Sequence, residues 1–281
     1  HPLQVKDFLY EIHEGICGSH AGGRSLAHRA ITQGYWWPYM QKDAEAYVKK
    51  CEQCQRFAPL IHQPAAELNP VSSPWPFAQW GMDLVGKLPQ ATGQRKYLLV
   101  ATDYFTKWIE AEPLAKIRDV DVKNFIWKNI ITRFGIPRAI VADNGTQFDS
   151  KLIKNFCAKF KIKNYFSTPS FSQSNGQAEA SNKVILDGIK KRLQAAKGKW
   201  VDELPNVLWA YRTTPRRSTG KSPFAMAYGT EAVIPLESGI PGIGTQGVEN
   251  DTNDIILARE LDLLEERREK VAIQLAVYQQ L

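Results

Sequence analysis

The sequence lacks several features that would place it in common protein classes. Its 281 residues include only four cysteines, too few for a disulfide scaffold of this length. No apolar run approaches the roughly 18 residues of a membrane-spanning helix, and no charged-then-apolar leader opens the chain. We therefore expect neither a membrane protein nor a secreted one. The chain starts at His1 rather than Met, which predicts a fragment cut from a longer polyprotein.

Charge is distributed unevenly along a chain that is 43% hydrophobic and can form a core. The net charge is +7, yet residues 151–221 carry 15 Lys and Arg against 4 Asp and Glu, a net +11. Residues 222–281 carry 4 against 10, a net −6. The basic segment predicts a polyanionic partner, with a merely solvated basic face as the equally weighted alternative.

Sequence patterns predict several segments of different structure. Residues 1–56 are typical of short helices, including 24–33 and 43–50, and five prolines between positions 59 and 76 indicate a linker. Beyond it we expect strands at 81–85, 97–103, 108–111, 139–142 and 162–166, and helices at 120–134, 150–160, 177–196 and 200–213. This order predicts an α/β fold, a mixed sheet flanked by helices.

A possible metal-ligand set lies near the N-terminus. Cys51 and Cys54 form a CxxC motif, and His13 and His20 lie upstream of it. Two imidazoles and two thiolates suit a tetrahedral Zn²⁺, which would supply folding energy to a module too small to bury much apolar surface. A redox motif or chance are the alternatives for the CxxC. We expect His28 on the helix surface.

Three carboxylates occupy positions that favour catalysis. Asp83 interrupts an apolar strand, Asp143 ends another, and Glu179 lies in the first turn of a long basic helix. Three such groups on adjacent elements would repel one another unless cations are present, and two Mg²⁺ ions would form a phosphoryl-transfer site. The alternatives are a simple Asn144-Gly145 turn after Asp143, and an ordinary first-turn acid at Glu179.

Two motif sets together resemble the integrases of Ty3/gypsy-type LTR retrotransposons, relatives of retroviral integrases and DDE transposases. The first set is His13…His20-Ala21-Gly22, Tyr35-Trp36-Trp37-Pro38 and Cys51…Cys54-Gln55. The second is Trp80-Gly81-Met82-Asp83, Asp103-Tyr104-Phe105-Thr106-Lys107-Trp108, Asp143-Asn144-Gly145-Thr146-Gln147-Phe148 and Asn175-Gly176-Gln177-Ala178-Glu179. The 35 residues between Asp143 and Glu179 match the family's D,D(35)E spacing.

The resemblance implies a role for each matching residue. Asp83, Asp143 and Glu179 become ligands of two Mg²⁺ or Mn²⁺ ions, and His13, His20, Cys51 and Cys54 become ligands of one Zn²⁺. Lys183 becomes a DNA contact, with Asn144 and Gln177 lining the site. Leu186 stands where relatives often carry a second lysine, so Lys190, Lys191 and Arg192 are further expected DNA contacts, or only a solvated helix end.

The resemblance also implies domains and a function. The expected segments are an HHCC zinc module (1–57), a Pro-rich linker (58–76), an RNase H-like catalytic core with a five-stranded sheet (77–235), a Gly-rich linker (236–253) and an amphipathic helix with a truncated end (254–281). The implied activity is 3′-end processing and strand transfer in the nucleus. Its partners are element-end and host target DNA, bound by a homo-oligomer. A nuclease on the same fold and a non-catalytic DNA-binding remnant are the alternatives.

Overall fold

The computed structural model describes residues 2–16, 18–56, 73–167, 183, 185, 187–189, 198–216, 218–233 and 263–280. The chain forms two compact units. The first contains residues 1–63 and 209–278, and the second contains 64–208 and 279–281. Among the described residues, none of the helices combines the length and apolar character needed to cross a membrane.

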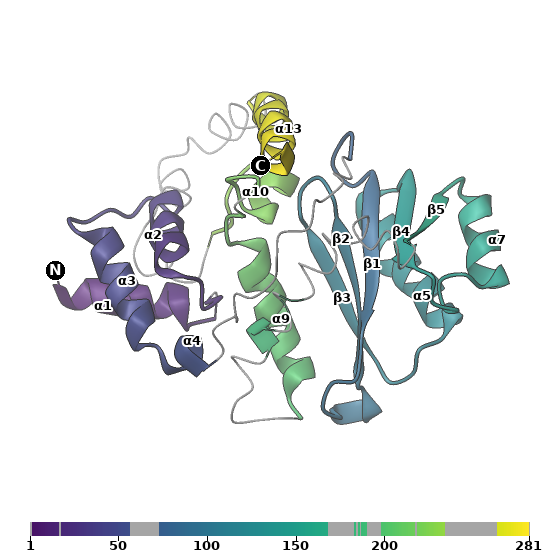
Figure 1. Cartoon of the computed structure of the whole chain (residues 1–281), viewed down its shortest axis with the longest axis horizontal. Helices are drawn as coiled ribbons and strands as arrows, with labels where there is room; N and C mark the ends of the chain where they lie inside the picture. Colours follow the sequence, from purple (N-terminus) through teal and green to yellow (C-terminus); the bar gives the residue numbers. More distant parts are fainter. Residues whose placement is uncertain are drawn as a thin grey trace, which may run out of the picture. The chain divides into compact units, whose positions relative to one another are not determined.

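The N-terminal part of the first unit is a cluster of short helices, as the sequence predicts (Figure 1). These are α1 (Pro2–His13), α2 (Gly23–Thr32), α3 (Met40–Lys50) and α4 (Glu52–Arg56). Apolar side chains from α1, α2 and α3 form one core, which includes Phe8, Leu26 and Met40. The ring of Phe8 also contacts Tyr35 and Trp37 from the loop before α3, at centroid distances of 4.5 and 5.8 Å.

A fully buried arginine holds this core to a later part of the same unit. Arg29 of α2 donates to Ile12 O at 3.3 Å and to Thr213 Oγ1 at 3.0 Å. The described remainder of the unit includes α10 (Pro223–Tyr228) and α13 (Leu264–Gln280). Helix α10 begins after the capping hydroxyl of Ser222 and ends at Gly229, whose φ of 88° suits glycine.

The second unit contains a mixed five-stranded sheet in the order β3-β2-β1-β4-β5 (Figure 1). The strands are β1 (Gln79–Val85), β2 (Tyr97–Asp103), β3 (Ile109–Leu114), β4 (Ala139–Asp143) and β5 (Lys163–Ser167). Strands β1, β2 and β3 pair antiparallel, whereas β1–β4 and β4–β5 pair parallel. The predicted α/β class and mixed sheet are therefore confirmed, and each strand lies within three residues of its expected bounds.

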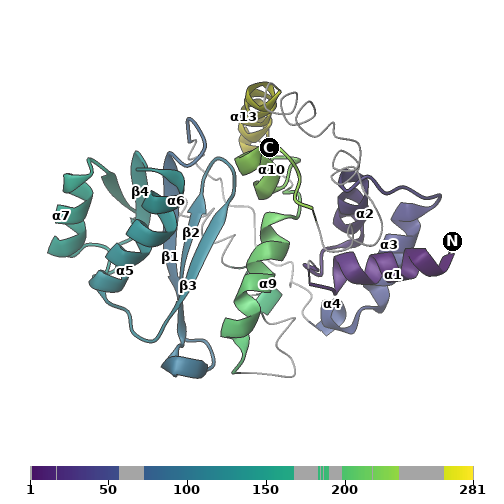
Figure 2. The same ribbon diagram turned by 180° about the vertical axis from the view of Figure 1, so that it is seen from behind.

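A helical segment, residues 119–134, lies in front of the sheet in Figure 2. Its residues Arg133 and Phe134 contact Glu110 and Trp80, so it covers the sheet face that carries these two side chains. The expected helix at 120–134 is divided into α5 (Asp119–Phe125), a π-helical turn η2 (Ile126–Ile131) and α6 (Thr132–Phe134). The expected helix at 150–160 is α7 (Lys151–Lys159), capped by Ser150 Oγ, which accepts from Ile153 N at 3.2 Å. Two further described elements are the 3₁₀ turn η1 (Thr92–Gln94) and α9 (Trp200–Arg212), whose residues from 209 onward belong to the first unit.

Several expected elements lie wholly or largely outside the described residues. They are the two linkers, the helix at 177–196, of which only residues 183, 185 and 187–189 are described, and the start of the C-terminal helix. Cys157 is described and is buried in α7.

Candidate zinc centre and carboxylate pair

Four side chains of the first unit that could bind a metal ion lie close together. His13, His20, Cys51 and Cys54 each offer one ligand atom, and these four atoms all lie within 4.8 Å of one another. His28 is exposed on α2 and does not belong to this group. The structure thus brings together the four residues that the sequence marks as zinc ligands.

Local backbone geometry positions the four ligands. His13 ends α1, Cys51 caps the C-terminus of α3, and Cys54 lies in α4. His20 reaches back by a tight loop, in which its N–H donates to His13 O at 3.1 Å and its φ is 48°. Gly18 is required in this loop, because a Cβ there would collide with His13 O.

The distances between ligand atoms fit a tetrahedral zinc ion. Cys51 Sγ lies 3.4 Å from His20 Nδ1, and Cys54 Sγ lies 3.3 Å from His13 Nε2 and 3.8 Å from His20 Nδ1. Zinc bonds of about 2.0–2.1 Å to nitrogen and about 2.3 Å to sulfur separate such atoms by roughly 3.5 Å. Four protein donors would close the coordination shell, which is typical of a structural zinc site.

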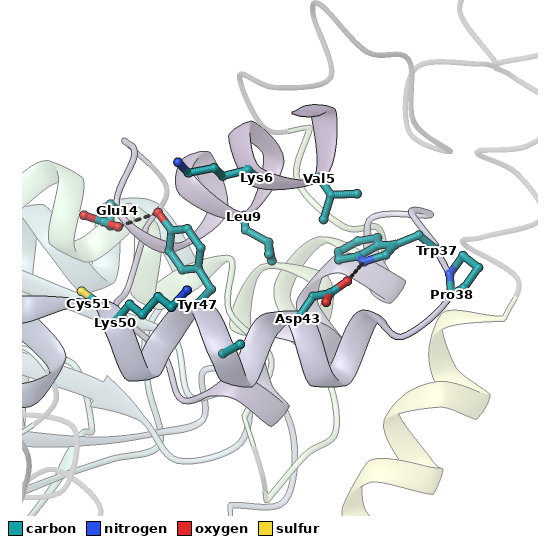
Figure 3. A pocket seen from close by; sticks show the side chains of 11 residues that line it. Val5, Lys6, Leu9, Glu14, Trp37, Pro38, Asp43, Tyr47, Lys50 and Cys51 are labelled. Carbon is teal, nitrogen blue, oxygen red and sulfur yellow. Dashed lines mark hydrogen bonds between the residues drawn. The ribbon is translucent and has the colours of Figure 1, made fainter. Parts of the chain in front are cut away.

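A groove between α1 and α3 is lined by Cys51 and by Glu14 and Tyr47 (Figure 3). Tyr47 Oη donates to Glu14 Oε1 at 2.6 Å, and the Tyr47 ring meets the His13 ring edge-on, with centroids 5.5 Å apart. Burial and the Glu14 carboxylate raise the pKa of Tyr47 above its ordinary value. The Tyr47 ring, held by Glu14, therefore packs against the His13 ring and restricts its orientation.

Two of the three predicted catalytic carboxylates lie on adjacent strands. Asp83 is in β1 and Asp143 is the last residue of β4. The strands pair parallel, with Gly81 opposite Val141. This is the last pair of the two strands, and Asp83 and Asp143 each lie two residues beyond it. Side chains alternate along a strand, so both carboxylates lie on the face that carries Gly81 and Val141.

Each carboxylate is half-buried and accepts a hydrogen bond from a nearby backbone amide. Leu84 N donates to Asp83 Oδ1 at 2.7 Å, and Gly145 N donates to Asp143 Oδ1 at 3.0 Å. The second bond shows that the Asn144-Gly145 segment does form a turn. That turn holds the Asp143 carboxylate by one oxygen and is therefore compatible with a ligand role for the side chain.

The other predicted site residues are only partly described. Asn144 is exposed directly after Asp143, and Lys183 is helical and exposed. Glu179, Gln177, Lys190, Lys191 and Arg192 lie outside the described residues.

A buried carboxylate in the sheet has a structural role that sequence reasoning did not assign. Asp103 ends β2 with no solvent exposure, and it accepts from Phe77 N (3.1 Å), Thr106 N (2.7 Å) and Thr106 Oγ1 (2.6 Å). Burial raises the pKa of Asp103 to about 6, although these hydrogen bonds oppose the shift. Asp103 thereby ties the β2–β3 turn to the segment that leads into β1. The Asp-x-x-Thr spacing, typical of side-chain-capped turns, was the available signal.

The same turn places an aromatic ring on the face that carries Asp83. A Cβ on Gly81 would lie 2.6 Å from Tyr104 Oη, so the Tyr104 ring covers Gly81, and Gly81 and Asp83 share a face of β1. Lys107 Nζ donates to Tyr104 O at 2.6 Å, and burial lowers the pKa of Lys107 to about 8. The strand that bears Asp83 is therefore tightly packed next to the carboxylate pair.

Comparison with known families finds two matches. Residues 2–59 match the family described as "Integrase zinc binding domain", and residues 74–171 match the "Integrase core domain". The first match contains all four zinc-ligand candidates, and the second contains Asp83 and Asp143.

Individual proteins are similar over most of the chain. The Pro-Pol polyprotein of feline foamy virus is 29% identical over 90% of this chain and 21% of its own length. The Gypsy retrotransposon integrase-like protein 1 of Bos taurus is 27% identical over 94% of this chain and 51% of its own. This chain therefore spans about a fifth and about half of these two relatives. A solved HTLV-2 integrase catalytic core domain, in complex with magnesium, aligns with 54% of this chain and 97% of its own at 20% identity and a TM-score of 0.45.

Proposed function

We propose, from the premise that this chain belongs to the integrases of retroviruses and LTR retrotransposons, that it inserts element DNA into host DNA by phosphoryl transfer. One observation carries the proposal. Asp83 and Asp143 lie on adjacent parallel strands, each two residues beyond the paired Gly81 and Val141, in a chain that also gathers a set of zinc-ligand candidates. Glu179, which follows Asp143 after 35 intervening residues, is the proposed third catalytic carboxylate.

The residues present fit divalent cations. Carboxylate oxygens are the ligands that Mg²⁺ prefers, and two neighbouring carboxylates on one sheet face are stabilised when a cation offsets their repulsion. Among the described residues, the hydrogen bond to Asp143 uses Oδ1 and leaves Oδ2 for a ligand. When bound, two Mg²⁺ or Mn²⁺ ions would stabilise charge on the attacking and leaving oxygens of an in-line displacement.

The chain's own residues bind and orient the DNA. Lys183 is exposed and helical, and it would hold a phosphate near the carboxylates, with Asn144 and Gln177 lining the site. Lys190, Lys191 and Arg192 extend the basic segment that carries a net +11. Binding should therefore weaken steeply with added salt and show little base preference.

The proposed partners are the two element ends and the host target DNA, held by a homo-oligomer in the nucleus. In this arrangement 3′-end processing hydrolyses a phosphodiester near the element end and leaves a 3′-hydroxyl. That hydroxyl attacks a target phosphodiester, so a new P–O bond forms while the bond from the phosphorus to the target 3′-oxygen breaks. The target 3′-oxygen leaves as a hydroxyl, and no covalent protein intermediate forms. The zinc module (1–57) and the catalytic core (77–235) are the proposed domains for these tasks.

The test is a strand-transfer assay with a labelled element-end duplex and Mg²⁺. We expect joined products from the wild-type chain, and a loss exceeding about a hundredfold in Asp83→Asn and Asp143→Asn, because even residues that only support a metal ligand cost about 10–100-fold when replaced. Both variants should retain DNA binding, since phosphate contacts rather than these carboxylates supply the affinity.

Asp149→Asn is the matched control, because Asp149 is an exposed carboxylate six residues after Asp143 in the sequence, and it pairs with Lys154 at 2.8 Å. Cleavage without joined product would identify a nuclease instead. Joining that is unchanged in Asp143→Asn, or no metal-dependent product from the wild type, would refute the proposed site.

A further inference from the structure

A group of exposed aromatic and basic side chains lies on the zinc module, away from the four zinc ligands. It borders a groove of about 750 Å³ formed by α2, the loop after it and the start of α3. We refer to this group as the aromatic surface; it consists of Arg24, His28, Ile31, Trp36, Tyr39 and Lys42.

The two rings of the aromatic surface are unusually exposed. Trp36 is 76% and Tyr39 is 80% exposed, although large aromatic side chains normally bury most of their area. The neighbouring Trp37 shows the usual arrangement, because it packs against Phe8 and donates to Asp43 Oδ2 at 3.0 Å. The loop therefore buries one tryptophan and presents the other to solvent.

The second ring belongs to a residue with a strained backbone. Tyr39 has φ 64° and ψ 15°, a left-handed conformation that costs a non-glycine residue free energy. The residue is the N-cap of α3, yet its side chain forms no capping hydrogen bond. Glycine would suit this conformation better, so the fold does not require a tyrosine here. A ligand that contacts the exposed ring would account for its presence.

Two basic side chains, Arg24 and Lys42, line the same groove as the rings. Arg24, His28 and Ile31 recur at helical spacing on one side of α2, and Lys42 follows Tyr39 in the first turn of α3. Within the described part of the chain, no carboxylate forms an ion pair with Arg24 or Lys42. The acidic residue at the groove, Glu45, instead accepts from Gln41 at 3.3 Å.

We propose that the aromatic surface binds single-stranded nucleic acid. Exposed rings beside cations are the pattern by which proteins stack unpaired bases and hold the adjacent phosphates. Bases inside a duplex are already stacked on one another and cannot lie flat on Trp36 or Tyr39. An apolar peptide would use the rings but would leave the flanking cations without a counterpart. This site is separate from the proposed catalytic carboxylates and does not depend on them.

The test is the binding of a fluorescein-labelled oligo(dT) of about 12 nucleotides, within the usual site size for such proteins, followed by fluorescence anisotropy without Mg²⁺. Trp36→Ala and Tyr39→Gly are each expected to weaken binding about tenfold, the typical effect of removing one stacking ring. Tyr39→Gly also relieves the left-handed strain, so a loss of binding cannot be attributed to misfolding, and zinc content verifies the fold of both variants.

Matched controls separate stacking from general effects. Tyr10→Ala removes a ring of the same module that is 53% exposed and outside the groove, and it should bind as the wild type does. Salt dependence is measured as the slope of the logarithm of the binding constant against the logarithm of the salt concentration. Lys42→Gln should reduce the magnitude of this slope by about 0.7. Lys49→Gln, which changes an exposed lysine of α3 outside the groove, should leave it unchanged. A duplex of the same length should lose less than about twofold in the ring variants.

The proposal is overturned if the wild type does not bind oligo(dT), or if the ring variants bind it unchanged. A change of oligomeric state in the ring variants, with oligo(dT) binding retained, would instead identify a protein interface. Asp143→Asn should bind oligo(dT) like the wild type. Failure of strand transfer and failure of this proposal are therefore distinguishable.

Discussion

Replacing Asp103 with asparagine would remove a buried charge from the sheet while keeping the size of the side chain. The native pKa of Asp103 is raised from 3.8 to about 6 by burial. The native state therefore binds the proton more tightly than the unfolded state does. The stabilisation from protonation is fully present below the unfolded pKa and is lost as the pH rises through about 6.

The size of this effect follows from the shift. Raising the pKa by about 2 means that protonation of Asp103 stabilises the native state by about 3 kcal/mol at low pH. About 2 kcal/mol of this stabilisation is lost between pH 4.5 and pH 7. The Asp103→Asn variant lacks this ionisation. Its own cost is independent of pH: the amide cannot accept from Phe77 N and from Thr106 N at once, and one unsatisfied buried group costs about 1–3 kcal/mol.

The assay is urea unfolding at pH 4.5, 5.5, 6.5 and 7, followed by tryptophan fluorescence in zinc-containing buffer. We expect the wild type to be more stable than Asp103→Asn at pH 4.5, with the difference falling by about 2 kcal/mol by pH 7. The exposed Asp149→Asn should show no such trend. A wild-type-minus-variant difference that stays constant with pH would refute the assignment of a raised pKa to Asp103.

Three further changes test other parts of the structure. Cys51→Ser, or chelation of zinc, should unfold the zinc module, because structural zinc supplies about 10 kcal/mol or more of folding energy. The unfolding would appear as a loss of helical circular dichroism, and unchanged helicity would argue against a structural metal. Gly81→Ala should destabilise the second unit by about 1–3 kcal/mol, because the new Cβ would lie 2.6 Å from Tyr104 Oη. Denaturant unfolding that matches the wild type would count against the position of the Tyr104 ring over Gly81. Ser150→Ala should cost about 1 kcal/mol in the same measurement, because it removes the cap on Ile153 N.

The sequence predicted most elements of the fold because local signals agreed with tertiary structure. The strand at 97–103 matches β2 at both ends, since a continuous apolar run bounded by polar residues reports a buried strand. The predicted helix at 120–134 missed its π-helical turn, because a single turn with wider hydrogen-bond spacing is too short to be distinguished from the ordinary variation of a helical pattern. The helix α3 begins at Met40, three residues before its expected start, because Tyr39 adopts a cap conformation that its residue type does not indicate.

The candidate site, like the fold, was predicted from the sequence only in part. Residue types and spacing identified the four zinc-ligand candidates that the structure gathers, since a CxxC with two upstream histidines carries its chemistry in the sequence itself. The sequence also marked Asp83 as a charge in an apolar strand. It could not reveal that β1 and β4 are adjacent and parallel, with Asp83 and Asp143 each two residues beyond the last pair, because strand pairing depends on residues far apart in the chain.

Burial and exposure were decided by tertiary structure alone. Asp103 and Asp149 are both aspartates near turns, yet the first is enclosed with three hydrogen bonds and the second is exposed. Trp36 and Trp37 are adjacent and chemically identical, but only Trp37 reaches the helical core. A residue type sets what a side chain can do, whereas its depth in the folded chain sets the dielectric and the partners that determine what it does.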